Sequence, residues 1–206
     1  MAITKKDLID FEEDICKLYC DAQIKAPIHL SDGNEDQLIE LFKKIDENDW
    51  VFSNWRSHYH ALLHGVDREW LRKEIIDGNS ITINNPEKHF FSSALVGGTC
   101  PIALGTALAL KKKKSKQKVW VFVGDMTSET GAFHESLKYA QNHDLPIIFV
   151  IEDNGQSVGT PTKTVWGMQE SELKAEPVKE IGSKLYKYSY IKKIYPHVGA
   201  GKWVRF

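Results

Sequence analysis

The chain has 206 residues, of which 42% are hydrophobic and 11% aromatic, a composition that supplies one globular core and excludes a disordered chain. Lys and Arg total 27 against 28 Asp and Glu, so the formal net charge of -1 gives no general attraction to nucleic acid or anionic membranes. No apolar stretch approaches the roughly 18 residues of a membrane span, and the amino terminus lacks the apolar core of a signal peptide. We therefore expect an intracellular, cytoplasmic protein of one domain, residues 1–206, without nucleic-acid or membrane partners.

The first third of the chain predicts two amphipathic helices. Apolar residues recur at helical spacing from Thr4 to about Ala26, and Thr4 with Asp7 is typical of a helix-capping pair. The polar stretch SDGNED (31–36) ends that pattern and can cap a second helix that reaches Ile45. Further along, the pattern predicts a short strand at 50–54, a helix around 68–76 and a loop with little regular structure at 77–93.

A strand-helix-strand unit is the best-defined part of the sequence. LVGGTCPIALGTALAL (95–110) has small residues early and helical spacing later, which predicts a closely packed helix. VWVFVG (119–124) predicts a strand, residues 131–143 a helix, and PIIFVIEDN (146–154) a second strand that is buried on both faces. A last strand with a turn is expected within 186–199. The economical interpretation is one α/β domain, a doubly wound, mostly parallel sheet flanked by helices.

Polar residues follow both strands of this unit. A right-handed crossover makes the two strands parallel, so we expect Asp125 and Asn154 at the same edge of the sheet. Oxygen donors at such an edge suit a magnesium ion that shares its ligands with phosphates. Gly124 allows close approach of the backbone, and Thr127 leads into a helix amino terminus that favours anions. The pattern therefore predicts a site for a diphosphate and its metal; the alternative is that Asp125 merely caps the following helix.

The spacing of the two motifs resembles a known cofactor signature. Between GDM (124–126) and DN (153–154) lie 26 residues, similar to the thiamine-diphosphate signature, in which GDG is followed by a pair of Asn or near equivalents. In that family the Asp and the second Asn bind magnesium, together with a main-chain carbonyl two residues later. The resemblance implies thiamine diphosphate and magnesium as cofactors, with a metal site made by Asp125, Asn154 and the carbonyl of Gln156.

Several segments together narrow the resemblance to one family. GDMTSETGAFHESLKYAQNHDLPIIFVIEDNGQSVGTP is similar to the alpha subunit of the decarboxylating component of 2-oxo-acid dehydrogenases (pyruvate dehydrogenase alpha-like), within the transketolase-like superfamily. ALVGGTCPIALGTALAL, IHLSDGNED and WRSHYH resemble further segments of that subunit, so the resemblance spans about residues 11–161. It implies the thiamine-diphosphate-binding fold, specifically the module that binds the diphosphate.

The same resemblance implies roles for the basic residues. Arg56 would hold a phosphate by charge-assisted hydrogen bonds, with a surface ion pair as the alternative. His29 would face the active-site channel and exchange protons or orient substrate, with a structural histidine as the alternative. In an extended segment His58 and His60 cannot face the same way, and we favour His58 as the catalytic one. His197 corresponds to a histidine on the phosphate side.

The sequence also departs from the family pattern. Met126 replaces the last Gly of the signature, Ala94 replaces a Gly beside the aminopyrimidine, and Trp55 replaces a Tyr that would reach phosphate. Side chains therefore intrude where backbone normally approaches the cofactor. The implied cofactor-binding set comprises Trp55, Arg56, Ala94, Val96, Gly124, Asp125, Met126, Thr127, Asn154, Gln156 and His197.

The resemblance implies half of an active site. In the family, a glutamate that activates the cofactor comes from a separate beta subunit, and no segment here is similar to that pyrimidine-binding domain. We expect a beta-like partner, in an α2β2 assembly, and a small-molecule 2-oxo acid as substrate. Two alternatives stay open: the amino-terminal subunit of a split transketolase, which moves two-carbon units between sugar phosphates, and a degenerate cofactor-binding subunit without catalysis.

Overall fold

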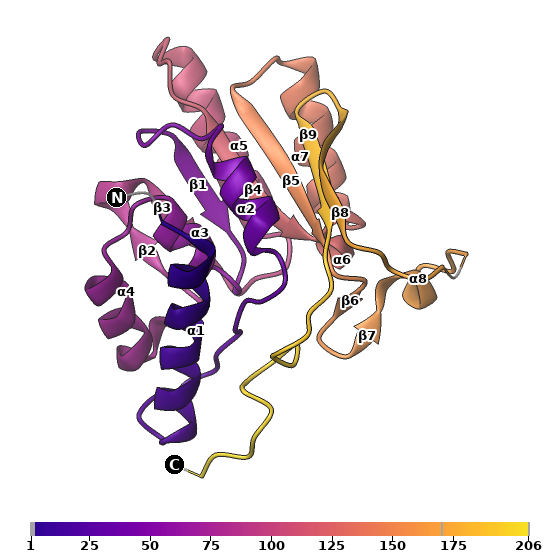
Figure 1. The fold of residues 1–206 in the computed structure, drawn as a ribbon. Coiled ribbons are helices and arrows are strands. Elements are labelled where there is room, and N and C mark those ends of the chain that lie inside the picture. Colours follow the sequence, from indigo (N-terminus) through magenta and orange to yellow (C-terminus); the bar gives the residue numbers. More distant parts are fainter. Residues whose placement is uncertain (1–2, 170, 206) are drawn as a thin grey trace.

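The computed structural model describes residues 3–169 and 171–205 (Figure 1). Within them, seven strands form one sheet in the order β2-β3-β1-β4-β5-β9-β8, and β6 pairs with β7 in a separate hairpin. The central pairings β3 with β1, β1 with β4, β4 with β5 and β5 with β9 are parallel, whereas β2 and β8 join as antiparallel edge strands. The predicted doubly wound, mostly parallel sheet is therefore confirmed.

The elements follow one another along the chain with short connections. The strands are β1 (Trp50–Ser53), β2 (Asn84–Asn85), β3 (Phe90–Ser92), β4 (Val119–Gly124), β5 (Ile147–Asp153), β6 (Gln156–Ser157), β7 (Thr160–Pro161), β8 (Glu176–Gly182) and β9 (Leu185–Ser189). The helices are α1 (Lys5–Cys20), α2 (Glu35–Phe42), α3 (His58–Leu63), α4 (Arg68–Glu74), α5 (Thr99–Lys112), α6 (Asp125–Ser128), α7 (Gly131–Asn142) and α8 (Thr162–Val165). A π-helical turn, Ile75–Asn79, extends α4, and Pro86–Lys88 is one turn of 3₁₀-helix. None of the described helices is long and apolar enough to cross a bilayer.

The sheet separates two hydrophobic cores because successive side chains of a strand point to opposite faces. In β4, Trp120 and Phe122 enter the core formed with α1 to α4. Val121 and its neighbours at alternate positions enter the second core, formed with α5 and α7. Figure 1 shows α1 and α2 on one side of the sheet and α5 and α7 on the other. Burial on both faces explains why β4 and β5 are almost continuously apolar.

Helix α1 starts where the sequence predicts and ends earlier. The Thr4 hydroxyl accepts from the Asp7 amide at 3.2 Å, and the Asp7 carboxylate accepts from the Thr4 amide at 2.8 Å, which confirms the capping pair. The helix ends at Cys20 because Ala22 adopts a left-handed backbone conformation with φ of 57°, which a right-handed helix cannot contain. Helix α2 likewise ends at Phe42, before Ile45.

The prediction of an irregular loop at 77–93 is wrong. This segment contains β2 and β3, and β3 pairs in parallel with β1, so that Phe90 lies opposite Val51. Phe90 is fully buried. A strand of three residues is too short to give an alternation pattern, and its stability comes from pairing with a distant segment.

Truncation of Phe122 tests the core beneath the sheet. Its ring is fully buried and stacks on Phe42 with centroids 5.5 Å apart. Phe122→Ala should lower the free energy of unfolding by about 3–5 kcal/mol because it leaves a cavity that the packed core cannot fill. Chemical denaturation measures this. Ile102→Ala is the control: its side chain is 50% exposed, so a loss as large as that of Phe122→Ala would contradict the assigned core.

Candidate functional site: a pocket at the carboxyl edge of the sheet

A pocket lies where four parallel strands end. Residues at or after the ends of β1, β4, β5 and β9 meet there. In the sheet, β3 lies on one side of β1, and the next strand of the sheet along the chain, β4, lies on its other side, so the strand order reverses at this point. Such a topological switch point is where open α/β sheets bind ligands. The lining residues are Asn54, Trp55, Arg56, Gly124, Asp125, Met126, Thr127, Glu152, Asn154, Gln156, Ser157, Tyr190 and His197. The predicted meeting of Asp125 and Asn154 at one edge is confirmed.

Asp125 is a buried carboxylate at the start of α6. The hydroxyl of Thr162, from α8, donates a hydrogen bond to its Oδ2 atom. Burial raises the pKa of Asp125 to about 6, an effect that the Thr162 hydrogen bond opposes and the nearby charge of Asp153 reinforces. Its side-chain hydrogen-bond donor thus comes from α8, and a cation bound beside the carboxylate would compensate its negative charge.

The predicted metal ligands provide oxygen atoms only. The amide oxygen of Asn154 accepts from the Gln156 amide at 3.2 Å, and its NH₂ group donates to the Tyr190 hydroxyl at 3.3 Å. Among the described residues, no three His, Cys, Asp or Glu side chains are arranged to hold a metal ion. One carboxylate, one amide and one main-chain carbonyl suit magnesium, which binds few protein oxygens and fills its shell with water and phosphate.

The other side of the pocket presents hydrogen-bond donors. Arg56 is 9% exposed, and its Nη2 atom donates to the His197 carbonyl at 2.8 Å. Four buried side-chain nitrogens have no hydrogen-bond partner among the described residues: Trp55 Nε1, Arg56 Nε, and Nδ1 and Nε2 of His197. A buried donor without an acceptor costs about 1–3 kcal/mol. These residues therefore fit an anionic, oxygen-rich ligand such as a diphosphate, which the charged guanidinium would bind most strongly.

Two histidines beside Arg56 are held in the neutral form. Burial and the charge of Arg56 lower the pKa of His197 to about 3 and that of His29 to about 4. The Nδ1 atom of His29 lies 3.1 Å from the His197 carbonyl, and its ring packs beside Trp55 with centroids 6.0 Å apart. His29 thus lies next to the pocket wall. At neutral pH it can orient a polar ligand through an uncharged ring.

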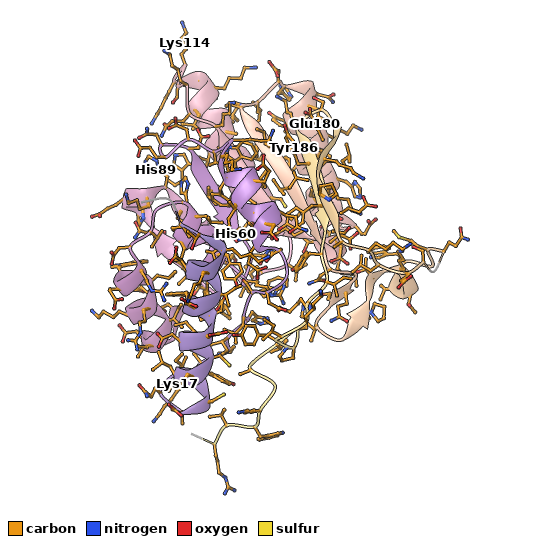
Figure 2. The ribbon with its side chains drawn as sticks, viewed as in Figure 1. Lys17, His60, His89, Lys114, Glu180 and Tyr186 are labelled. Atoms are coloured by element: carbon orange, nitrogen blue, oxygen red, sulfur yellow. The ribbon has the colours of Figure 1, made fainter. Side chains whose placement is uncertain are left out.

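The segment that carries His58 and His60 is helix α3, so the prediction of an extended segment is wrong. Both side chains are buried. The ring nitrogens of His58 contact Glu12 and Ser80, each at 3.0 Å, away from the pocket lining. His60, labelled near the centre of Figure 2, contacts Glu152 at 3.0 Å, and Glu152 lines the pocket. The structure therefore brings His60, and not His58, close to the site.

Of three further residues predicted to contact the cofactor, one lines the pocket and two do not. Met126 lines the pocket, and its sulfur accepts a hydrogen bond from Trp166 Nε1 at 3.2 Å. Ala94 and Val96 lie in the exposed loop before α5 and are not among the lining residues; the side chain of Val96 is 54% exposed. The pocket thus gathers the predicted diphosphate and metal residues, while the predicted pyrimidine contacts face outward.

Four residues of the site were missing from the sequence analysis. Asn54 and Glu152 are polar residues at the carboxyl ends of buried strands, a signal that could have found them, as it found Asp125. Ser157 directly follows the predicted Gln156, and Tyr190 reaches the pocket only through tertiary packing. Burial acts to raise the pKa of Glu152, but contact with His60 and other donors outweighs it, so the pKa is lowered and the carboxylate stays charged.

The lowered pKa of His197 predicts how stability depends on pH. The unfolded chain takes up a proton near pH 6.5, whereas the folded chain does so only near pH 3, so folding stability falls as pH drops through this range. Between pH 7 and pH 4 the wild type should lose on the order of 3 kcal/mol more than His197→Gln, which has no such proton to bind. Denaturant unfolding at both pH values measures the difference; parallel pH dependence of the two proteins would contradict a buried, neutral His197.

The chain matches a family model along most of its length. The model, described as the dehydrogenase E1 component, matches residues 4–178. The alpha subunit of acetoin:2,6-dichlorophenolindophenol oxidoreductase from Bacillus subtilis (strain 168) is 30% identical over 161 residues, which are 73% of this chain and 48% of that protein. The pyruvate dehydrogenase E1 component subunit alpha of Porphyra purpurea is 29% identical over 184 residues, 81% of this chain and 54% of that protein.

A solved structure from Mycobacterium smegmatis, described as a thiamin diphosphate-dependent enzyme, superposes with a TM-score of 0.43 and 18% identity over 66% of this chain and 22% of that chain. The chain spans about half the length of the curated relatives it matches. The match over residues 4–178 shows the family: this chain belongs to the dehydrogenase E1 component family and is similar to its alpha subunits.

Proposed function

We propose that this chain binds thiamine diphosphate through magnesium and acts as the alpha-type subunit of an enzyme that decarboxylates a 2-oxo acid. The observation that carries the proposal is the composition of the single pocket at the sheet edge described above. The pocket combines the oxygen ligands of Asp125, Asn154 and Gln156 with buried nitrogens of Arg56 and His197 that have no partner among the described residues. A diphosphate bound to a divalent cation would match both sets of groups at once.

The residues of this chain would bind and orient the cofactor. When bound, thiamine diphosphate supplies an electron sink for the negative charge left when carbon dioxide departs. Arg56 would fix one end of the diphosphate, and the metal ligands would fix the other, so that the rest of the cofactor has a defined direction. The neutral ring of His29, beside Trp55, would orient a substrate carbonyl or carboxylate without competing with Arg56 for charge.

A second subunit would complete the site. The loop before α5 exposes Leu95 by 74% and Val96 by 54%, and Ile102 in the first turn of α5 is 50% exposed. Exposed apolar side chains so close in the sequence support a protein contact. We propose that a beta-like, pyrimidine-binding subunit covers this region, in an α2β2 assembly. Ala94 and Val96 would then contact the aminopyrimidine at the interface.

Loss of a metal ligand should weaken cofactor binding strongly without unfolding the protein. Asp125→Ala and Asn154→Ala each remove one oxygen ligand from the pocket, so each should weaken magnesium-dependent binding of thiamine diphosphate at least about tenfold. Titration calorimetry with and without magnesium measures this. Asp144→Ala is the matched control, because that carboxylate is 87% exposed and pairs with Lys184, far from the pocket. Unchanged affinity in both pocket variants would refute the assignment.

The half-site proposal predicts that turnover needs two chains. The purified chain with thiamine diphosphate and magnesium should release no carbon dioxide from a 2-oxo acid, and addition of its beta-like partner should start the release. Arg56→Met should lower activity of the reconstituted enzyme mainly by raising the cofactor concentration required, because it removes the phosphate-binding charge. Turnover of a 2-oxo acid by the isolated chain would overturn the half-site proposal.

A further inference from the structure

Residues 190–199 contribute to the pocket although they lie beyond the part of the chain that the family model matches. The family match ends at residue 178, whereas His197 lines the pocket. In Figure 1 this yellow segment leaves the sheet after β9 and runs towards the lower end of α1. The His197 carbonyl accepts from Arg56 Nη2 and lies 3.1 Å from His29 Nδ1. The course of this segment therefore decides where Arg56 and His197 point.

One buried carboxylate holds the segment in place. Asp32, in the loop between α1 and α2, is 1% exposed. Its Oδ2 atom accepts from the main-chain amides of Lys193, at 2.6 Å, and Ile194, at 2.8 Å. Its Oδ1 atom accepts from Lys192 Nζ at 2.5 Å, and the same ammonium group donates to the Leu30 carbonyl at 2.8 Å. Three donors of one short segment thus converge on a single side chain.

The two segments also approach as closely as a glycine allows. Gly33 has a φ of 84°, and a Cβ atom at this position would lie 2.2 Å from the Ile191 carbonyl oxygen. Any other residue would push the segments apart. The contact is therefore specific in shape as well as in charge.

We propose that Asp32 is a positioning residue of the site: it clamps residues 192–194 and so fixes Arg56 and His197 for an anionic ligand. Its relevance to binding rests on the proposed function, with the diphosphate of thiamine diphosphate as that ligand. Asp32 itself is not among the residues that line the pocket and would act through the segment.

Removal of the carboxylate would release the segment for a definite physical reason. Lys192 would remain as a buried ammonium beside the charge of Arg56, and burial together with that charge already lowers its pKa. The amides of Lys193 and Ile194 would lose their acceptor. A buried group that loses its partner is costly, so moving the segment into water becomes favourable.

Amide hydrogen exchange tests the clamp without any ligand. The Gly199 amide donates to the Ile28 carbonyl at 2.9 Å and reports docking of the segment beyond the clamp itself. Asp32→Ala should increase its exchange rate at least about tenfold. Asp32→Asn, which keeps one carbonyl acceptor, should give an intermediate rate. Asp14→Ala, which breaks the partly exposed ion pair between Asp14 on α1 and Arg72 on α4, should leave the rate unchanged. Unchanged exchange in Asp32→Ala would overturn the clamp.

Calorimetric titration of the same variants with thiamine diphosphate and magnesium tests the link to binding. Asp32→Ala should weaken binding at least about tenfold, Asp32→Asn less, and Asp14→Ala not at all. A released segment with unchanged affinity would overturn the positioning role while leaving the proposed function intact. No binding by the wild type would overturn the proposed function, and with it the role of Asp32 in binding; the exchange of Gly199 then decides only whether the clamp exists.

Discussion

Parallel pairing of β4 with β5 is the constraint on which the site depends. The register places Gly124 opposite Glu152, so both strands end at the same level and their following residues meet in one pocket. A slip by one residue would turn every side chain of a strand to the opposite face. In β4 the large rings of Trp120 and Phe122 fill one core and the smaller valines at alternate positions fill the other, so a slip would put side chains of the wrong size into both cores. The packing energy of the two cores, far larger than that of any single polar contact, thus fixes the positions of the side chains that follow β4 and β5.

Burial gives the pocket its electrostatic character. Arg56 carries a charge, whereas His29 and His197 beside it are held neutral by burial and by that charge. Asp125 titrates near pH 6 because burial disfavours its charged form. A divalent cation beside Asp125 would favour the carboxylate and attract an anion towards Arg56. Under the proposed function, a metal and a phosphate group would therefore bind better together than either would alone.

A buried hydrogen-bond network links residues that line the pocket to the protein interior. Glu152 lies at its centre, with His60 at 3.0 Å and Asn54 donating at 3.2 Å. Asn54 in turn accepts from the main-chain amide of Arg56 at 2.8 Å, which fixes the start of the segment that carries the guanidinium. Such networks stiffen a site when all their members are paired. The position of Arg56 is thus set from two directions, by this network and by the His197 carbonyl.

The sequence by itself determined the central sheet and the meeting of two oxygen-bearing side chains at its edge. Strands β4 and β5, helix α7 between them, and the meeting of Asp125 with Asn154 follow from apolar runs, spacing and the handedness of crossovers, which are local or nearly local rules. Only the tertiary structure decided the rest. The short strand β3, the helical conformation around His58, the contact of Glu152 with His60 and the clamp of Asp32 on Lys192 all depend on contacts between distant segments. Local patterns carry no record of such contacts, because their energy exists only once the chain has folded.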